Sequence, residues 1–195
     1  WWAFKQLYEA GKIYEGEKVL MYDTKFATPV SKAEVTMDND AYQTVTDPSV
    51  YVKFSLMDED AAVLAWTTTP WTLPANLMLA VNPEMTYCEV EVDGEKLILA
   101  EEALERTLQD DKHQPLDYDV LRTFPGSELV GKTYQPLDTG SNWPENDKVH
   151  TIYAADFVSH ESGTGIVHIA PAYGEDDFEL GKANGIAPFH VIDDN

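Results

Sequence analysis

The chain has 195 residues, a length that corresponds to one domain or to one domain with terminal extensions. Its 44% of hydrophobic and 25% of charged residues are typical of globular proteins and argue against an intrinsically disordered chain. Asp and Glu outnumber Lys and Arg by 35 to 13, and the net charge of −22 repels phosphate at long range. This charge argues against a general nucleic-acid-binding protein, but it is compatible with a pocket that admits only the last nucleotide of a strand.

The sequence also limits the surroundings of the protein. Cys88 is the only cysteine, so a disulfide framework and a cysteine-based zinc site are excluded. A single cysteine indicates a reducing compartment, most simply the cytoplasm. No apolar run approaches the ~20 residues of a membrane span, so we expect no membrane partner. Because the sequence begins at Trp1 and ends at Asn195 without an obvious terminator, we expect a segment of a longer polypeptide.

The predicted elements begin with a helix over residues 1–10, where Trp1, Phe4 and Tyr8 recur at helical spacing. Residues 17–35 have no strong period, and we expect a loop with short strands there. Alternating or continuous apolar runs predict eight strands after this loop. They are residues 51–57, 61–69, 77–81, 85–92, 96–100, 118–124, 148–154 and 166–170.

Turn and helix signals separate these strands. Asp93-Gly94 predicts a hairpin turn, and two prolines make residues 70–76 a structured turn rather than a strand. Helices are predicted over residues 101–108 and 174–184, the second with a capping box from Asp176 to Glu179 that would place Asp177 in its first turn. Many strands with few helices, in no regular βαβ order, predict an α+β fold with a mainly antiparallel or mixed β-barrel core and peripheral helices.

The densest run of chemically useful residues extends from Trp66 to Asn76. Thr67, Thr68 and Thr69 end a buried strand, and a proline-locked turn follows. Hydroxyl groups held in this way give fixed hydrogen-bond donors and acceptors with methyl groups beside them, which suits a small pocket for a polar ligand. The alternative is that threonine simply favours strands.

A second run extends from Ser162 to Asp177. Gly163 and Gly165 permit close approach of the backbone to a ligand, and His168 ends a strand. Asp177 opens a helix, where the helix dipole favours the ionised carboxylate, and such a carboxylate suits an ammonium group. The alternatives are a structural histidine and a solvated start of a helix.

Other motifs are weak. Residues 137–140 match the short signature of aspartic proteases, but those enzymes need two aspartates and the signature occurs once. His160, Glu161, His168 and the nearby aspartates lack a recognised metal-ligand spacing. We therefore predict neither a metal ion nor a cofactor.

Together, the two runs resemble the editing domain that is inserted in the catalytic domain of isoleucyl-tRNA synthetases. The resemblance includes residues 1–7, 67–76 and 163–177. The related valyl and leucyl enzymes carry Arg at the position of Thr69 and an acidic residue at the position of Trp71, so the isoleucine branch is favoured.

The resemblance implies a single editing domain over residues 1–195, in which residues 1–20 and 186–195 lead toward a catalytic domain. The aminoacylation motifs His-Ile-Gly-His and Lys-Met-Ser-Lys-Ser are absent, so this chain is not expected to charge tRNA. The cysteine that many relatives carry is missing from residues 23–31, which leaves the lineage open.

The implied activity is hydrolysis of valine wrongly attached to the isoleucine tRNA, by a positioned water in a pocket that excludes isoleucine. The implied partners are the 3′-terminal adenosine of that tRNA and the catalytic domain, and the isolated domain is expected to be a monomer. The alternative function is a non-catalytic module that binds the aminoacylated terminus or a partner protein.

The resemblance also assigns roles to individual residues. Asp177 corresponds to the aspartate that binds the substrate's α-ammonium group, and His168 to a histidine that helps to reject isoleucine. The expected catalytic residues are Thr67, Thr68 and Asp177, and the expected substrate-binding residues are Thr69, Trp71, Asn76, His168 and Asp177, with Trp71 and Asn76 near the terminal adenosine and the pocket wall.

Overall fold

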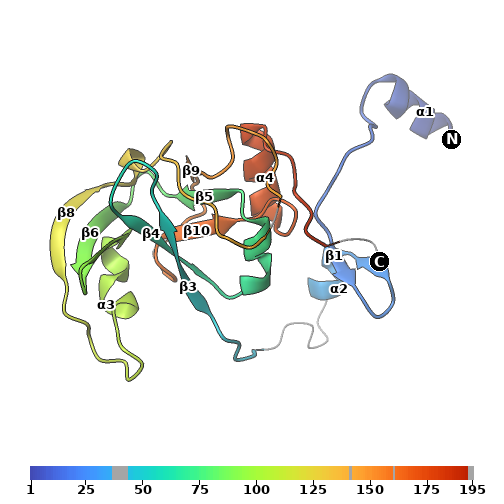
Figure 1. Cartoon of the computed structure of the whole chain (residues 1–195). Coiled ribbons are helices and arrows are strands. Elements are labelled where there is room, and N and C mark those ends of the chain that lie inside the picture. Colours follow the sequence, from blue (N-terminus) through green and yellow to red (C-terminus); the bar gives the residue numbers. More distant parts are fainter. Residues whose placement is uncertain (37–43, 141, 160, 193–195) are drawn as a thin grey trace. The chain divides into compact units, whose positions relative to one another are not determined.

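The computed structural model describes residues 1–36, 44–140, 142–159 and 161–192. The chain divides into two compact units, Trp1–Tyr42 and Gln43–Asn195 (Figure 1). Each unit is described separately, and the predicted site residues all belong to the second.

The first unit contains two helices and a short hairpin. Helix α1 (Trp2–Glu9) confirms the predicted N-terminal helix, and none of its side chains is buried within this unit. Strands β1 (Met21–Asp23) and β2 (Thr28–Val30) pair antiparallel, as expected for short strands in this region. The sequence prediction missed helix α2 (Lys32–Thr36), although Ser31 and Glu34 exchange the reciprocal hydrogen bonds of a capping box.

The second unit contains a five-stranded sheet in the order β3-β4-β7-β6-β8. Its strands are β3 (Val50–Ser55), β4 (Ala62–Thr67), β6 (Thr86–Val92), β7 (Glu95–Ala100) and β8 (Asp119–Pro125). Among the described strand pairs of this sheet, β4 with β7 is parallel and the others are antiparallel. The predicted hairpin turn joins β6 to β7, where Asp93 and Gly94 have φ angles of 52° and 83°, as a type I′ turn requires.

A three-stranded sheet in the order β10-β5-β9 completes the ladders of this unit. Strand β5 (Met78–Val81) lies between β10 (Ile166–Ile169), its antiparallel partner, and β9 (Thr151–Ala154), its parallel partner. Strand β5 is buried on both faces. Leu79 and Val81 belong to the larger core, which the five-stranded sheet dominates, and Met78 and Ala80 to the smaller one. This position between two cores explains the continuous apolar run.

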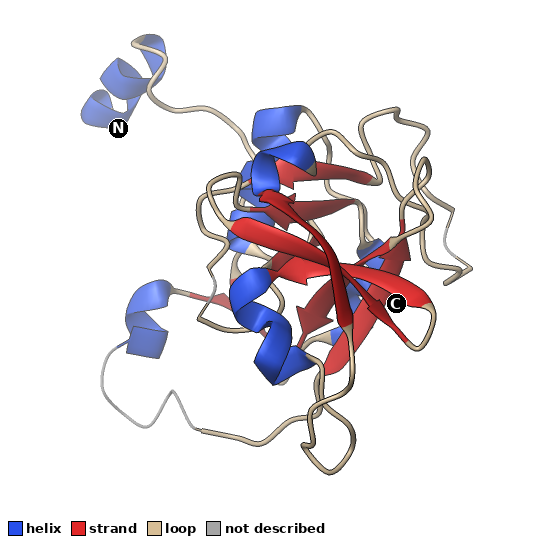
Figure 2. Cartoon of the chain, turned by 90° about the vertical axis from the view of Figure 1, so that its left-hand side faces the viewer, coloured by secondary structure: helices blue, strands red, loops and turns tan. Residues whose placement is uncertain are grey.

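The expected β-barrel core is not confirmed. Within the described residues no ladder joins β3 to β8, the two outermost strands of the five-stranded sheet, so the sheet does not close. Isolated bridges from Leu56 to Tyr134 and from Thr133 to Thr151 connect the two larger sheets near one edge. The α+β class is correct, and in Figure 2 the strands of the second unit gather at its centre with helices outside them.

Short helices lie between the strands of this unit, and a longer one follows the last strand. The short ones are η1 (Pro70–Ala75), η2 (Glu101–Ala103), α3 (Leu104–Thr107) and η3 (Gly126–Glu128), and α4 (Glu175–Asn184) follows β10. The predicted capping box at Asp176 is wrong, because Gly174 is the N-cap residue of α4. Asp177 nevertheless lies in the first turn, as predicted, and Gly185 ends the helix in the left-handed conformation with φ 72°.

Candidate functional site

A cavity of about 320 Å³ lies in the second unit, and both predicted runs line it. The first run contributes the end of β4 and the residues that follow it, and the second contributes the loop before β10, β10 itself and the start of α4. The lining residues are Trp66, Thr67, Thr68, Thr69, Thr72, Phe157, Ser159, Ser162, Gly163, Thr164, Gly165, Ile166, Val167, His168, Ala170, Tyr173 and Asp177. Segments about 100 residues apart in the sequence therefore form one site.

The threonines form one wall of this cavity. The Thr67 side chain is buried, and its Oγ1 accepts a hydrogen bond from the backbone N–H of Thr69 at 3.0 Å and lies 3.2 Å from the Thr69 Oγ1. These contacts fix the chain where it leaves β4. Thr68 is exposed, and its hydroxyl has no hydrogen-bond partner among the described residues, so it is available to a ligand.

His168 lies on β10 with 7% of its surface exposed. Its Nε2 is 2.9 Å from the Thr72 Oγ1, and its Nδ1 is 2.8 Å from the Asn76 Nδ2. Burial lowers the pKa of His168 to about 4, so the imidazole is neutral at physiological pH. Because both ring nitrogens are engaged and the pKa is low, His168 can shape the cavity but is poorly suited to accept a proton.

Asp177 is the third residue of α4, and its carboxylate lies at the cavity. Its Oδ1 accepts a hydrogen bond from the backbone N–H of Ala170 at 2.7 Å. Burial raises the pKa of Asp177, although hydrogen bonds from the N–H groups of Ala170 and of Asp177 itself act in the opposite direction. A poorly solvated carboxylate beside a cavity attracts a cation strongly, because the cation replaces part of the lost hydration.

The glycines of the second run serve packing inside the protein. A Cβ on Gly165, which has φ 74°, would lie 2.5 Å from the Ala100 Cβ, so this backbone approaches β7 closely. A Cβ on Gly163 would lie 3.0 Å from the Trp66 ring, on the same loop beside the cavity. The Tyr87 hydroxyl donates to the Gly165 carbonyl at 2.6 Å and holds the loop on β6.

Two predicted site residues do not line the cavity. Trp71 is 68% exposed on η1. Asn76 is buried, and it contacts His168 from behind the cavity wall. Sequence reasoning did not assign roles to Thr72, which was part of the threonine run, or to Tyr134, whose hydroxyl donates to the Asn76 Oδ1.

The other sequence motifs do not contribute to this cavity. Asp138 of the protease-like signature is exposed and is not a lining residue. Among the described residues, no group of three or more His, Cys, Asp or Glu side chains is arranged to hold a metal ion, and His160 lies outside those residues. None of the helices in the described ranges is both long and apolar enough to cross a membrane.

Comparison with known proteins identifies the family. An isoleucine–tRNA ligase of Mycobacterium tuberculosis (strain H37Rv) is 43% identical over 98% of this chain and 19% of its own length. The isoleucine–tRNA ligase of Chlamydia abortus is 41% identical over 100% of this chain and 18% of its own length. The model of the family described as tRNA synthetases class I (I, L, M and V) matches residues 1–78. This chain is homologous to isoleucine–tRNA ligases. The resemblance predicted from the two runs is confirmed, and the chain spans about a fifth of the length of these relatives.

Two crystal structures share the fold of this isoleucine–tRNA ligase homologue. GlLeuRS-CP1 aligns with a TM-score of 0.57 and 20% identity over 71% of this chain and 63% of that chain. The editing domain of the P. knowlesi cytosolic leucyl-tRNA synthetase aligns with a TM-score of 0.51 and 16% identity, over 69% of this chain and 62% of that chain. At these identities the likeness shows the fold alone, and that fold is the one of a synthetase editing domain.

Proposed function

We propose that this chain is an editing hydrolase of isoleucine–tRNA ligase, which cleaves the ester of valine wrongly attached to the isoleucine tRNA. Homology to isoleucine–tRNA ligases supports the family, and likeness to editing domains supports the type of module. The observation that carries the proposal is the cavity of about 320 Å³ in which three threonines, a neutral histidine and a half-buried carboxylate meet.

A physical need explains such a second site. One missing methylene changes binding by only ~1–3 kcal/mol, a limit for which isoleucyl enzymes are the standard example, so the synthetic site alone discriminates poorly against valine. A pocket that is too small for isoleucine but open to valine removes the error by hydrolysis. The wall at His168 and Thr69 supplies the size limit in this proposal.

Some of the remaining residues bind the amino acid, and others contact the ester that is hydrolysed. Asp177 binds the α-ammonium group of the valine, and Thr67, Thr68 and Thr69 contact the ester region. Because His168 is neutral with both nitrogens engaged, it does not take the proton of the attacking water. As the water oxygen bonds to the ester carbonyl carbon, the bond from that carbon to the ribose oxygen breaks, and the proton passes to this departing oxygen, directly or through the neighbouring ribose hydroxyl. Positioning of water then replaces a nucleophilic triad.

Trp71 and Asn76 have different proposed roles. The exposed Trp71 ring on η1 suits contact with the terminal adenosine, because aromatic rings stack on bases. Asn76 acts from behind the wall, through His168.

Replacement of Asp177 by Ala tests the proposal. The purified chain is mixed with isoleucine tRNA that carries labelled valine, and loss of the ester is followed over time. We expect Asp177→Ala to slow hydrolysis by about 30-fold or more, because truncating one partner of a desolvated charge pair costs at least ~2 kcal/mol. Glu179→Ala is the matched control, since Glu179 is exposed two residues later on the same helix and should leave the rate unchanged. Equal rates for the Asp177→Ala variant and the parent chain would contradict the assignment.

The second candidate is a non-catalytic module that binds the aminoacylated terminus. It is favoured by the state of the one hydroxyl–imidazole pair named above in the cavity lining, Thr72 with His168, because the lowered pKa of His168 and the engagement of both its ring nitrogens make it a poor base. The same assay separates the two functions. A binding module would leave the ester intact, while a non-hydrolysable valyl-adenosine analogue would still bind with an affinity that depends on Asp177.

The proposal extends to organisation, partners and compartment. Since the homologous ligases are about five times longer, we propose that the chain is a single editing domain, with residues 1–20 and 186–195 leading toward the catalytic domain of the same polypeptide. That domain would supply most contacts to the tRNA backbone, and the chain by itself would be a monomer. The buried thiol of Cys88 agrees with a reducing compartment such as the cytoplasm.

A further inference from the structure

A buried chain of hydrogen bonds lies behind the cavity wall and connects Tyr134 to His168. The Tyr134 hydroxyl is 2.7 Å from the Asn76 Oδ1, and the Asn76 Nδ2 is 2.8 Å from the His168 Nδ1. On the far side of the ring, the His168 Nε2 is 2.9 Å from the Thr72 Oγ1, which in turn lies 2.9 Å from the Thr69 carbonyl oxygen. Tyr134 and Asn76 are each 1% exposed.

The direction of every hydrogen bond in this chain follows from one carbonyl group. The Asn76 Nδ2 is also 2.8 Å from the Met78 carbonyl oxygen, which can only accept, so the amide nitrogen must face it. The second hydrogen of this amide nitrogen then points to the His168 Nδ1, which must accept. The Asn76 oxygen faces Tyr134, whose hydroxyl therefore donates.

The same reasoning fixes the proton of His168. Since Nδ1 accepts and the ring is neutral, the hydrogen is on Nε2 and is donated to the Thr72 Oγ1. The Thr72 hydroxyl hydrogen then points to the Thr69 carbonyl oxygen. A rotation of the imidazole ring would break both of its hydrogen bonds, so the ring presents one fixed face to the cavity.

Tyr134 is held firmly at the start of this chain. Its backbone N–H donates to the His150 carbonyl at 3.0 Å, and its ring packs edge-on against Phe54 with centroids 5.2 Å apart. Its backbone also pairs with Leu56 in one of the bridges that connect the two sheets. Burial raises the pKa of the Tyr134 hydroxyl well above its ordinary range, so it keeps the hydrogen that it donates.

We infer that Tyr134 is a positioning residue, which acts through Asn76 to hold His168 as the Nε2–H form and so fixes the cavity wall that His168 and Thr72 make. The effect on amino-acid selection rests on the proposed function, whereas the effect on the imidazole does not. Tyr134 lies outside both sequence runs and does not line the cavity.

Nitrogen NMR of the chain with labelled histidine tests the imidazole directly, because a ring nitrogen that bears hydrogen resonates far from one that does not. Loss of signals in His168→Gln identifies the pair that belongs to His168. We expect the parent chain to show hydrogen on Nε2 alone. Tyr134→Phe should broaden this pattern or add a second one, because the Asn76 oxygen is left without its donor in a buried site and only the Met78 carbonyl still holds the amide. Asn76→Asp, which puts an acceptor beside Nδ1, should move hydrogen onto Nδ1.

Tyr153→Phe is the matched control, since the Tyr153 hydroxyl donates to the Lys148 carbonyl and forms none of the hydrogen bonds that connect Tyr134 to His168. It should leave the His168 pattern unchanged. Hydrogen on Nδ1 in the parent chain, or an identical pattern in the parent and in Tyr134→Phe, would overturn the inference.

Hydrolysis supplies the second measurement. Tyr134→Phe should raise the ratio of isoleucine to valine released from the tRNA by about tenfold, while Tyr153→Phe should not. If valine ester is not hydrolysed at all but the NMR patterns change as expected, the proposed function fails and the positioning of His168 by Tyr134 is upheld.

Discussion

His168 combines two properties that decide what it can do in the cavity. It is buried with a pKa lowered to about 4, and both of its ring nitrogens are bonded within the protein. A general base needs a pKa near the working pH and a free nitrogen, so His168 meets neither condition. In the proposed function, the His168 ring therefore acts by filling space in the cavity, and its hydrogen bonds to Asn76 and Thr72 keep it in place.

Removal of this volume is expected to relax the size limit. His168→Ala should allow hydrolysis of the correct isoleucyl ester and raise its rate relative to the valyl ester by about tenfold, because one methylene is worth ~1–3 kcal/mol in such a pocket. The two rates are measured with isoleucine tRNA carrying either amino acid.

His113→Asn is the control for that substitution. His113 is exposed, is not a lining residue, and has a φ angle of 59° that asparagine tolerates. It should leave both rates unchanged. An unaltered ratio in His168→Ala would contradict the size-exclusion role.

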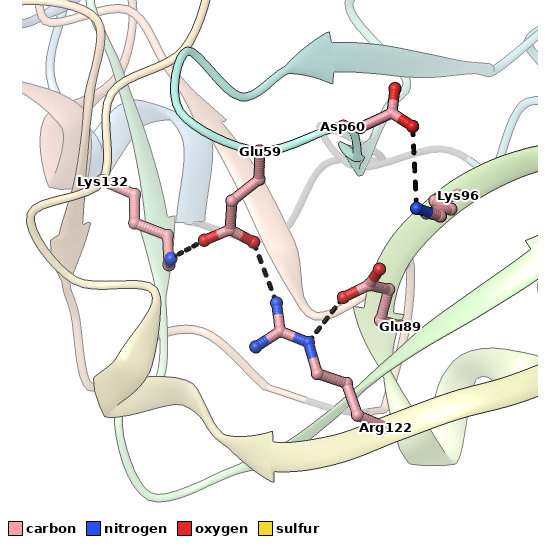
Figure 3. Close-up of polar contacts among 6 residues, drawn as sticks. All are labelled: Glu59, Asp60, Glu89, Lys96, Arg122 and Lys132. Carbon is pink, nitrogen blue, oxygen red and sulfur yellow. Dashed lines mark hydrogen bonds and ion pairs between the residues drawn. The ribbon is translucent and has the colours of Figure 1, made fainter.

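At the scale of elements, an ion-pair network links the loop between β3 and β4 to β6, β8 and the chain that follows β8 (Figure 3). Glu59 lies between Arg122 and Lys132, and Arg122 also contacts Glu89 with its Nε at 2.5 Å. The Lys132 ammonium, the Arg122 guanidinium and their hydrogen bonds lower the pKa of Glu59 below its ordinary value of 4.5. A group with a lowered pKa in the folded state stabilises the fold above the pKa of the unfolded state, and this stabilisation is lost as the pH falls through the folded-state pKa.

Glu59→Gln should therefore lower the free energy of unfolding by about 1 kcal/mol at pH 7, since Glu59 is partly exposed and the pairs are partly screened. The difference from the parent chain should shrink as the pH falls below about 4.5, because protonation removes the same charge from the parent. Urea unfolding at several pH values measures it. Asp60→Asn is the control, as this carboxylate is fully exposed and 3.6 Å from Lys96. A stability difference that does not vary with pH would contradict the role of charge.

The sequence alone predicted well those elements whose formation depends on neighbouring residues in the chain. Alternation located β3 and β6, and Asp93-Gly94 specified the turn between β6 and β7 because both residues accept positive φ angles. The N-cap of α4 was missed because Gly174 has no side chain that signals a cap. Closure of the sheets depends on pairing between distant segments, such as Leu56 with Tyr134, and no local pattern encodes it.

The residues of the candidate site likewise include some that the sequence predicted and some that it did not. Thr67, His168 and Asp177 were predicted from two dense runs, and the structure brings these runs together around one cavity. Asn76 belonged to a run but lies behind the wall, which depends on how η1 leads into β5. Tyr134 gave no signal, because its role exists only through a contact with a residue 58 positions away.

For the whole molecule, the acidic charge would set how the chain binds tRNA under the proposed function. The chain has 13 basic and 35 acidic residues. Several of the basic side chains already form ion pairs or hydrogen bonds within the second unit. Lys53 pairs with Glu95, Arg122 and Lys132 pair with Glu59, and the Lys148 ammonium donates to the Asn184 carbonyl at 3.0 Å. The acidic residues exceed the remaining basic ones, so in the proposed function the terminal adenosine and its amino acid would supply most of the affinity of this chain for tRNA.

The chain by itself should therefore bind isoleucine tRNA weakly, and its affinity should change by less than about tenfold between 50 mM and 200 mM salt. A protein with 6–10 phosphate contacts loses about 10³–10⁵ in affinity over this range, because each contact releases counterions. Filter binding at a series of salt concentrations measures the slope. Lys112→Gln, which removes an exposed ammonium with no partner among the described residues, should reduce the slope by at most about one phosphate contact. A tight complex with a steep salt dependence would mean that the acidic surface conceals a basic path for the tRNA backbone, and recognition would then not depend on the terminal nucleotide.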